Sequence, residues 1–129
     1  MSDCGVCLGG YDTDGCAEFH EVRWPKARKE HQCVDCNRKI RPGEVYQRFA
    51  GKYDGEFYYE TTCRICVEIR NAFTCAEYDQ VGPPPGELWS DIQEVMFPRL
   101  TTACFDKLKT PEAKAFLRVR WMKWKGLAP

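Results

Sequence analysis

Six of the nine cysteines in the sequence form three pairs with the pattern Cys-x-x-Cys, at Cys4/Cys7, Cys33/Cys36 and Cys63/Cys66. This spacing allows two thiolates from one turn of backbone to bind the same metal ion. So many cysteines in a chain of 129 residues indicate either a disulfide framework or metal ligands. The paired spacing favours metal ligands, and with them a reducing compartment that keeps the thiols reduced.

The second and third pairs predict a zinc site made of Cys33, Cys36, Cys63 and Cys66, with 26 residues between the two pairs. Four thiolates at about 2.3 Å complete the tetrahedral coordination of Zn²⁺ and leave no position for water or substrate. We therefore expect a structural zinc ion. A redox-active dithiol would need one pair at a strand-to-helix junction of an α/β sheet, and the surrounding sequence lacks that pattern.

A second zinc site is predicted in the Gly- and Asp-rich segment 1–19, which cannot form a core alone and would be ordered by a bound ion. Three of its ligands would be Cys4, Cys7 and Cys16. Cys75 is the preferred fourth ligand because it completes an all-thiolate set, although it could instead be a small core residue. The alternatives for the fourth ligand are His20, which has the better local spacing, and His31. Cys104 is expected in the core.

A β-hairpin and a helix are expected to position the first zinc site. Aromatic-rich runs at 45–49 and 57–59 flank Asp54-Gly55, which is typical of a tight turn because Gly tolerates positive φ. Residues 63–73 then place Cys66, Ile69 and Phe73 on one helical face, with Thr62 as the expected N-cap. A knuckle, a hairpin and a helix in this order predict a small α+β zinc-binding domain, a treble clef.

The chain continues into a predicted C-terminal helical extension. The run Gly82-Pro-Pro-Pro-Gly86 is a strong linker signal, and an amphipathic helix over 88–96 follows and is ended by Pro98. A last helix is expected from the N-cap Thr110 toward Gly126. The predicted division is therefore a cysteine-rich segment 1–22, a zinc module 23–80 and an extension 87–129.

The formal net charge of zero conceals four blocks, with net charges of −4 in 1–19, +5 in 20–53, −7 in 54–98 and +6 in 99–129. The chain as a whole therefore lacks the basic field that attracts nucleic acid. The two basic blocks could still adjoin in the fold and form a patch. The simpler interpretation is that the blocks are solvated faces or pair with one another.

Several of these motifs resemble the small treble-clef zinc proteins of tailed bacteriophages and prophages. The resemblance covers residues about 18 to 71, and it is carried by Lys26-Ala-Arg-Lys-Glu-His31-x-Cys33-x-x-Cys36, Ile40-x-Pro-Gly-Glu44-x-Tyr46, Gly51, Asp54-Gly55 and Thr62-Cys63-x-x-Cys66-x-x-x-Arg70. Leu88-Trp89-x-Asp91-Ile92 is also similar to a short acidic helix that follows the zinc module there. The resemblance implies the fold and leaves the activity open. Residues 99–129 depart from the family pattern and are expected to be the specialised part.

The first functional hypothesis is a non-enzymatic accessory protein of phage type that binds a host protein and alters its activity. The expected binding residues lie on the last helix and are Arg118, Arg120, Trp121 and Trp124. Trp and Arg are overrepresented among binding hot spots, and alternating charge blocks suit complementary docking. We therefore expect this helix to contribute more to binding than to stability.

The alternative hypothesis is a nucleic-acid-binding zinc module. Its phosphate contacts would come from basic residues around the knuckle, namely Lys26, Arg28, Lys29, Arg38, Lys39 and Arg41. Such contacts give salt-dependent binding of low specificity. The hairpin aromatics Tyr46, Phe57, Tyr58 and Tyr59 offer rings for base stacking, although packing against one another is the simpler role.

An enzyme is not predicted, because the sequence has two histidines and no Ser/His/Asp constellation, Gly-rich phosphate loop or carboxylate-rich centre. No run of about 20 apolar residues is present, and Met1-Ser-Asp-Cys4 does not resemble a signal peptide. We therefore expect a cytoplasmic protein without a membrane partner, located in the host cytoplasm if the gene belongs to a phage.

Overall fold

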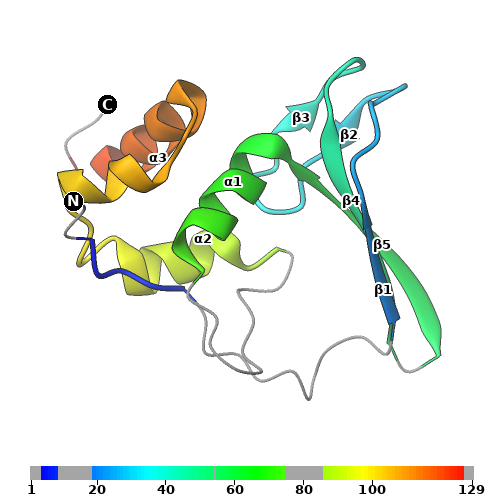
Figure 1. The fold of residues 1–129 in the computed structure, drawn as a ribbon, viewed down its shortest axis with the longest axis horizontal. Coiled ribbons are helices and arrows are strands. Elements are labelled where there is room, and N and C mark those ends of the chain that lie inside the picture. The colour runs from blue at the N-terminus through cyan, green and yellow to red at the C-terminus, as the bar shows by residue number, and fades with distance from the viewer. Residues whose placement is uncertain (1–3, 9–18, 54, 75–85, 127–129) are drawn as a thin grey trace.

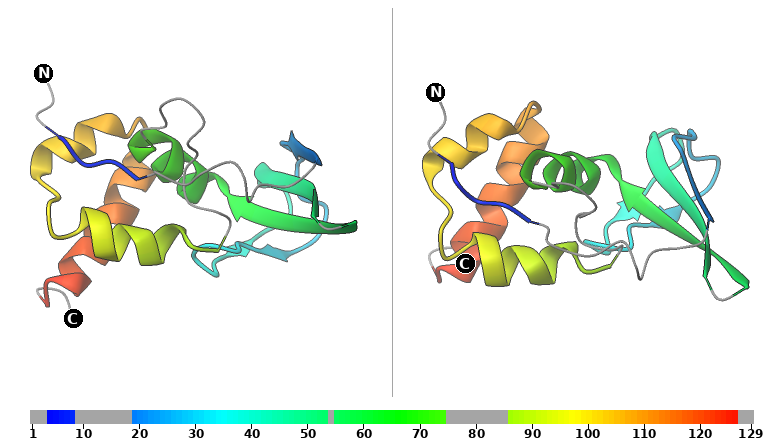
Figure 2. Two further views of the ribbon diagram at one scale, coloured as in Figure 1. Left: turned by 90° about the horizontal axis from the view of Figure 1, so that it is seen from below. Right: turned by 60° about the horizontal axis from the view of Figure 1, so that its bottom comes forward.

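The computed structural model describes residues 4–8, 19–53, 55–74 and 86–126. It is a small α+β structure with two lobes (Figure 1). The strands β1 to β5, within residues 19–63, form the sheet lobe. The helices, within residues 64–74 and 86–126, form the helical lobe together with residues 4–8. Figure 2 shows the same separation from two further sides, with the long hairpin pointing away from the helices.

The sheet lobe is built on a three-stranded antiparallel sheet in the order β1-β4-β5. Strands β4 (Tyr46–Tyr53) and β5 (Glu56–Cys63) form the predicted hairpin, and Gly55 in its turn has a φ of +80°. Strand β1 (Phe19–Arg23) pairs with β4 along its whole length and was not predicted. Its short sequence Phe-His-Glu-Val-Arg carries too little apolar alternation to indicate a strand.

A second, two-stranded sheet consists of β2 (His31–Gln32) and β3 (Lys39–Ile40). The turn between these strands contains Cys33 and Cys36 and is the predicted knuckle. Asn37 within it has a φ of 64°, a conformation that Asn tolerates better than most residues. The N–H of Asn37 donates to the carbonyl of Cys33, and the N–H of Cys33 donates to the carbonyl of Arg38. These bonds close the knuckle into a compact loop.

The helical lobe begins with α1 (Arg64–Phe73), whose N-cap is Cys63 rather than the predicted Thr62. The predicted helix over 88–96 is one turn of α-helix, α2 (Leu88–Asp91), followed by a π-helical turn, η2 (Ile92–Met96). A 3₁₀ helix, η3 (Thr102–Lys107), precedes α3 (Pro111–Trp124). The predicted start of α3 is confirmed, since Pro111 occupies its first turn and the side chain of Thr110 accepts a hydrogen bond from the N–H of Ala113.

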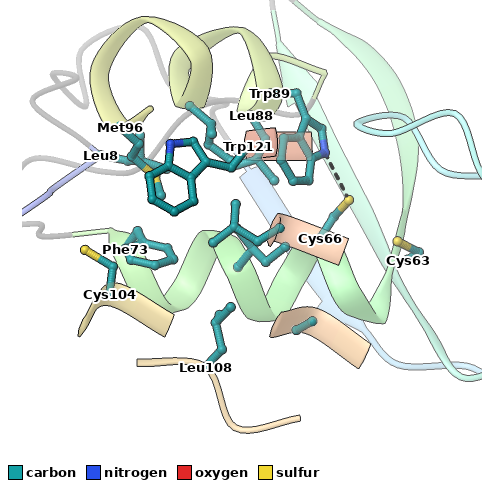
Figure 3. Close-up of a cluster of buried hydrophobic side chains, with 14 of the residues drawn as sticks. Leu8, Cys63, Cys66, Phe73, Leu88, Trp89, Met96, Cys104, Leu108 and Trp121 are labelled. Atoms are coloured by element: carbon teal, nitrogen blue, oxygen red, sulfur yellow. Dashed lines mark hydrogen bonds between the residues drawn. The ribbon is translucent and has the colours of Figure 1, made fainter. Parts of the chain in front are cut away.

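The buried side chains form one hydrophobic cluster that crosses the predicted domain boundaries. Ile69 and Phe73 of α1 belong to this cluster with Leu88 from α2 and Leu117 from α3. Figure 3 shows Phe73 and Leu88 among its members. The N-terminal segment also contributes, because Leu8 is buried and its N–H donates to the carbonyl of Phe73 at 2.6 Å. The predicted extension 87–129 therefore shares its core with the zinc module.

Trp121 belongs to this core, which corrects the expectation of an exposed Trp121/Trp124 pair. Trp121 is only 8% exposed, its ring lies 5.9 Å from that of Phe105, and its Nε1–H donates to the carbonyl oxygen of Phe97. Trp124, by contrast, is 45% exposed. The reason is helical periodicity: Ala113, Leu117 and Trp121 follow one another at intervals of four along the buried face of α3. One face of this helix is thus part of the core, and its predicted role in binding stays a prediction.

No helix within the described residues is long and apolar enough to cross a membrane.

Candidate metal centre

The sulfur atoms of Cys33, Cys36, Cys63 and Cys66 all lie within 4.8 Å of one another, so these four residues could hold a metal ion. The Sγ atoms of Cys36 and Cys63 are 3.7 Å apart. In a tetrahedral thiolate site with metal–sulfur bonds of about 2.3 Å, the sulfurs lie about 3.8 Å apart. The cluster therefore has the composition and size of a four-thiolate site. It lies where the two lobes meet, between the knuckle and the junction of β5 with α1.

Backbone hydrogen bonds bring the knuckle to the end of β5. The N–H of Val34 donates to the carbonyl of Thr61 at 2.8 Å, and the Thr61 hydroxyl donates to the carbonyl of Gln32 at 2.6 Å. These two bonds fix the knuckle beside the strand that ends at Cys63. The first turn of α1 then adds Cys66, three residues further on. Both cysteine pairs are thus brought together by these backbone contacts and by the start of α1.

A buried ion pair joins the knuckle to the helical lobe. Asp35, between the two knuckle cysteines, accepts two hydrogen bonds from the guanidinium of Arg70 on α1, at 2.9 and 3.2 Å. Its Oδ1 also accepts the backbone N–H of Gly86 at 2.7 Å, just before α2. The Asp35 side chain is fully buried. Because this bidentate geometry satisfies both carboxylate oxygens, the pair orients the knuckle against α1.

The indole of Trp89 and the charge of Arg38 both act on the sulfur atoms. The indole Nε1–H of Trp89 donates to Sγ of Cys66 at 3.4 Å, as the dashed line in Figure 3 shows. Arg38 is placed beside Cys63: burial lowers the pKa of its guanidinium, but the hydrogen bond and charge of Cys63 outweigh that and raise the pKa. Four thiolates around a divalent cation carry two excess negative charges, which such donors stabilise.

Hydrogen bonds among the thiols favour ionisation of part of the cluster. The bond with Cys36 is the main reason why the pKa of Cys33 lies far below its ordinary value, and the bond with Cys33 raises the pKa of Cys36 in turn. For Cys63, the bond with Cys33 raises the pKa while those with Cys36 and Cys66 lower it, which leaves a value of about 7. The cluster therefore offers thiolate near neutral pH, the form that binds metals.

The predicted second zinc site is corrected at Cys4 and Cys7. Cys4 forms a disulfide with Cys104, 100 residues away, and Cys7 is also disulfide-bonded. A disulfide sulfur is not a thiolate, so neither residue serves as a zinc ligand in this structure. The chain thus combines a thiol cluster with a disulfide, which the expectation of a uniformly reduced protein did not include.

The remaining residues of that prediction are not brought to a metal site. Cys16, Cys75 and the side chain of His20 lie outside the described residues. His31 is described, and its Nε2 lies 3.3 Å from the hydroxyl of Tyr46. Within the described ranges, the four-cysteine cluster is the one group of ligand-type side chains close enough to share an ion.

The residues predicted to bind a protein partner mostly pack against core aromatics. The guanidinium of Arg120 lies 4.4 Å from the ring of Trp89, and that of Arg118 lies 5.3 Å from the ring of Phe105. The ring of Trp124 lies 5.6 Å from that of Phe97 but stays half exposed. Together with the buried Trp121, these residues spread over α3 instead of forming one exposed patch.

The basic residues of the nucleic-acid alternative divide into two groups. Lys26, Arg28, Lys29 and Arg41 are exposed. Lys39 pairs with Glu30 at 3.5 Å, and Arg38 pairs with Glu44 at 3.2 Å besides its contact with Cys63. Arg38 therefore supports the cysteine cluster. The contacts of Arg38 and Trp89 with the cysteines were not predicted from the sequence. A side chain that reaches a cysteine sulfur from another element has no fixed spacing from the cysteines in the sequence.

Comparison of the chain with protein-family models, with curated proteins and with solved structures finds no match. The resemblance to phage treble-clef proteins therefore stays a prediction.

Proposed function

We propose that this chain is a non-enzymatic zinc protein in which one Zn²⁺, bound by Cys33, Cys36, Cys63 and Cys66, stabilises a binding module. The observation that carries the proposal is the approach of four sulfurs to within 4.8 Å, in a cluster where three of the four cysteines are buried. Zinc is the metal proposed because tetrahedral sets of four thiolates are typical of structural zinc sites. When bound, the ion would stabilise the fold and would not take part in a catalytic reaction.

We also propose that residues 23–74 have the treble-clef arrangement. The elements that support this are the knuckle between β2 and β3, the β4–β5 hairpin and α1, in that order along the chain. Each cysteine pair lies where the arrangement requires it, one pair in the knuckle and the other at the start of the helix. The ion would join the sheet lobe to the helical lobe.

A structural role for the ion, and not a catalytic one, follows from the closed coordination. Four protein ligands leave no position at which a water molecule could be activated, which is the feature that distinguishes structural from catalytic zinc. A host protein as partner stays a prediction. Of the residues expected to bind it, Trp121 is core, whereas Arg118 and Trp124 are exposed.

Metal analysis of the purified chain tests the proposal. We expect one zinc per chain at this cluster, and Cys63→Ser should lose it together with the ordered structure of the knuckle and hairpin, because metal binding and folding are coupled. Thr102→Ser, an exposed and conservative change in the helical lobe, is the control and should retain zinc. A metal-free protein with native structure would contradict the proposal.

The closed coordination can be tested separately with cobalt. The Co²⁺-substituted protein should show thiolate-to-metal charge-transfer bands that do not change when azide is added, because azide binds at open coordination positions. A spectral change on titration with azide would indicate an open, catalytic type of site instead.

A further inference from the structure

One face of the β1-β4-β5 sheet carries cations on β1 and β4 and aromatic rings on the neighbouring strand β5. Residues directly opposite one another in an antiparallel sheet share a face. The register pairs Lys52 with Phe57, Ala50 with Tyr59 and Arg48 with Thr61, and on the other side of β4 it pairs Arg48 with Arg23. We call the surface formed by Arg23, Arg48, Lys52, Phe57 and Tyr59 the cationic face.

The rings of the cationic face are open to solvent. Phe57 is 62% exposed and Tyr59 is 58% exposed, the two highest values among the exposed large apolar side chains of the described residues. The guanidinium of Arg48 lies 4.6 Å from the ring centre of Tyr59, and the ammonium of Lys52 lies 5.6 Å from that of Phe57. Ala50, opposite Tyr59, is too short to cover its ring. The hairpin points away from the helical lobe, so the helices do not shield this surface (Figures 1 and 2).

Charge is separated across the sheet. The cationic face has one acid in the described residues, Glu21, and it pairs with Arg23 at 2.7 Å. The opposite face of the hairpin carries Glu56 and Glu60 at the alternate positions of β5. That face is also where the rings of Phe49 and Tyr58 pack together, 5.9 Å apart, with Tyr58 lying over Gly51. Phe49 and Tyr58 therefore pack against each other, whereas the ring contacts described for Tyr59 and Phe57 are with the cations Arg48 and Lys52.

We propose that the cationic face binds single-stranded nucleic acid, with bases stacked on Phe57 and Tyr59 and phosphates contacted by Arg48 and Lys52. Exposed aromatic rings with neighbouring cations match a ligand that has flat apolar surfaces and a negative charge at every repeat. Phe57 and Tyr59 are two residues apart in one strand, about 7 Å along it, so adjacent unstacked bases can reach separate rings.

A single strand is favoured over the other ligands that cations attract. The bases of a duplex are stacked on one another and cannot reach the two rings, so a duplex would use the cations alone. An acidic protein segment would likewise use the cations and leave two large rings exposed. The surface also differs from the six basic residues named above within 26–41, so the two possible nucleic-acid sites can be separated by mutation.

The inference rests on the proposed function, since it names the partner of the binding module, and it can be tested on the full zinc-loaded chain. Fluorescence anisotropy would follow the binding of a labelled oligo-dT strand of about 15 nucleotides at several salt concentrations. The single variants Phe57→Ala and Tyr59→Ala should each bind the strand with an affinity lower by about fivefold or more. The pair Arg48→Gln/Lys52→Gln should weaken binding and reduce the slope of log K against log salt by about 1.4.

Two matched pairs serve as controls. Arg99→Gln/Lys123→Gln removes the same charge from the helical lobe and should change affinity less than twofold. Lys26→Gln/Lys29→Gln tests the basic segment near the knuckle and should have a smaller effect than the sheet pair. Zinc content and circular dichroism, measured on each sample, separate a failure of the metal centre from a failure of binding.

The inference is overturned if the zinc-loaded protein does not bind the strand at low salt. It is equally overturned if a duplex or polyglutamate binds as tightly as the single strand, or if the helical-lobe pair weakens binding as much as the sheet pair. Loss of binding in Lys26→Gln/Lys29→Gln with no loss in the ring variants would move the site to the knuckle.

Discussion

At the scale of single residues, the cysteine cluster depends on side chains that are not ligands. Trp89 donates its indole N–H to Sγ of Cys66 from α2, and its ring lies 5.6 Å from that of Phe116 and beneath the guanidinium of Arg120. The indole is therefore held in place on one side by α3 while it donates to the ligand sulfur on the other. A hydrogen bond of this kind stabilises a thiolate and orients it toward the ion.

Replacing Trp89 by Phe should weaken metal binding while keeping the apolar packing of the ring. Loss of a hydrogen bond to a metal ligand commonly costs about tenfold or more in affinity. Competition with a chromophoric chelator would measure the zinc affinity of the variant against that of the wild type. Trp124→Phe is the control, because Trp124 has no bond to a ligand sulfur and lies at the far end of α3. Equal affinities in all three proteins would show that the N–H···S bond is energetically unimportant.

The ligands of the first site could be predicted from spacing, whereas the disulfide could not. A Cys-x-x-Cys pair constrains geometry locally, so four such cysteines around a hairpin point to one ion. Cys4 and Cys104 are 100 residues apart, and the connectivity of disulfides cannot be deduced from sequence alone. Cys4 also belonged to a Cys-x-x-Cys pair, which made the metal interpretation the natural one. Only the packing of residues 4–8 against η3 brings the two sulfurs together.

At the scale of elements, α3 is joined to α1 through one carboxylate. Glu68 of α1 accepts hydrogen bonds from the backbone N–H groups of Lys109 and Thr110, at 2.8 and 3.1 Å, and from the Thr110 hydroxyl at 2.8 Å. The same hydroxyl accepts the N–H of Ala113 as the N-cap of α3. A single acid thus fixes both the start of α3 and its position on α1, and a negative charge at a helix N-terminus is itself favourable.

Replacing Glu68 by Gln should destabilise the fold by about 1–2 kcal/mol at pH 7, because charge-assisted bonds are lost and an amide NH₂ faces backbone donors. Burial raises the pKa of Glu68, but hydrogen bonds from Thr110 and Lys109 outweigh it and hold the pKa below its ordinary value of 4.5. The advantage of the wild type over the variant should therefore be complete above that value and shrink as the pH falls through the lowered pKa.

Urea unfolding of both proteins between neutral and acid pH would measure this difference. Acid also protonates the cysteine thiolates, but it does so in both proteins. The difference in unfolding free energy between the two proteins at each pH therefore excludes that effect. Glu112→Gln, in the first turn of α3 and exposed, is the control and should differ little from the wild type. A difference between the wild type and Glu68→Gln that persists unchanged in acid would contradict the assigned role of the charge.

Elements with strong local signals could be predicted, and those that depend on tertiary pairing could not. The turn at Gly55, Thr110-Pro111 and the apolar face of residues 66–73 each encode structure locally, and each lies where it was expected. Strand β1 exists because β4 has a free edge to pair with, and its own sequence gives little indication of it. The π-helical turn at Ile92–Met96 similarly departs from a helix whose apolar periodicity is regular.

At the scale of the whole molecule, one continuous cluster of buried side chains joins the sheet lobe to the helical lobe. The buried cluster runs from the cysteines through α1 to α2 and α3. The Asp35–Arg70 pair and the N–H of Gly86 add a polar connection between the knuckle and the segment before α2. The cationic face, by contrast, lies along the hairpin, where few of the described side chains are buried. Stability and proposed binding are therefore located in different parts of the molecule.

This continuity predicts that damage to the core of α3 will reach the metal centre. Leu117 is fully buried, and Leu117→Ala should cost about 2–5 kcal/mol of stability through the lost apolar contacts and the cavity left behind. Because Phe116 and Arg120 of the same helix hold Trp89 against Cys66, loosening α3 should also speed the release of zinc to a chelator.

Val119→Ala changes an exposed side chain of the same helix and should alter neither property. Thermal unfolding together with the rate of zinc release would test both expectations on one sample. A lower unfolding midpoint with an unchanged release rate would mean that the two lobes are energetically independent, and that the zinc module needs no support from the C-terminal helix.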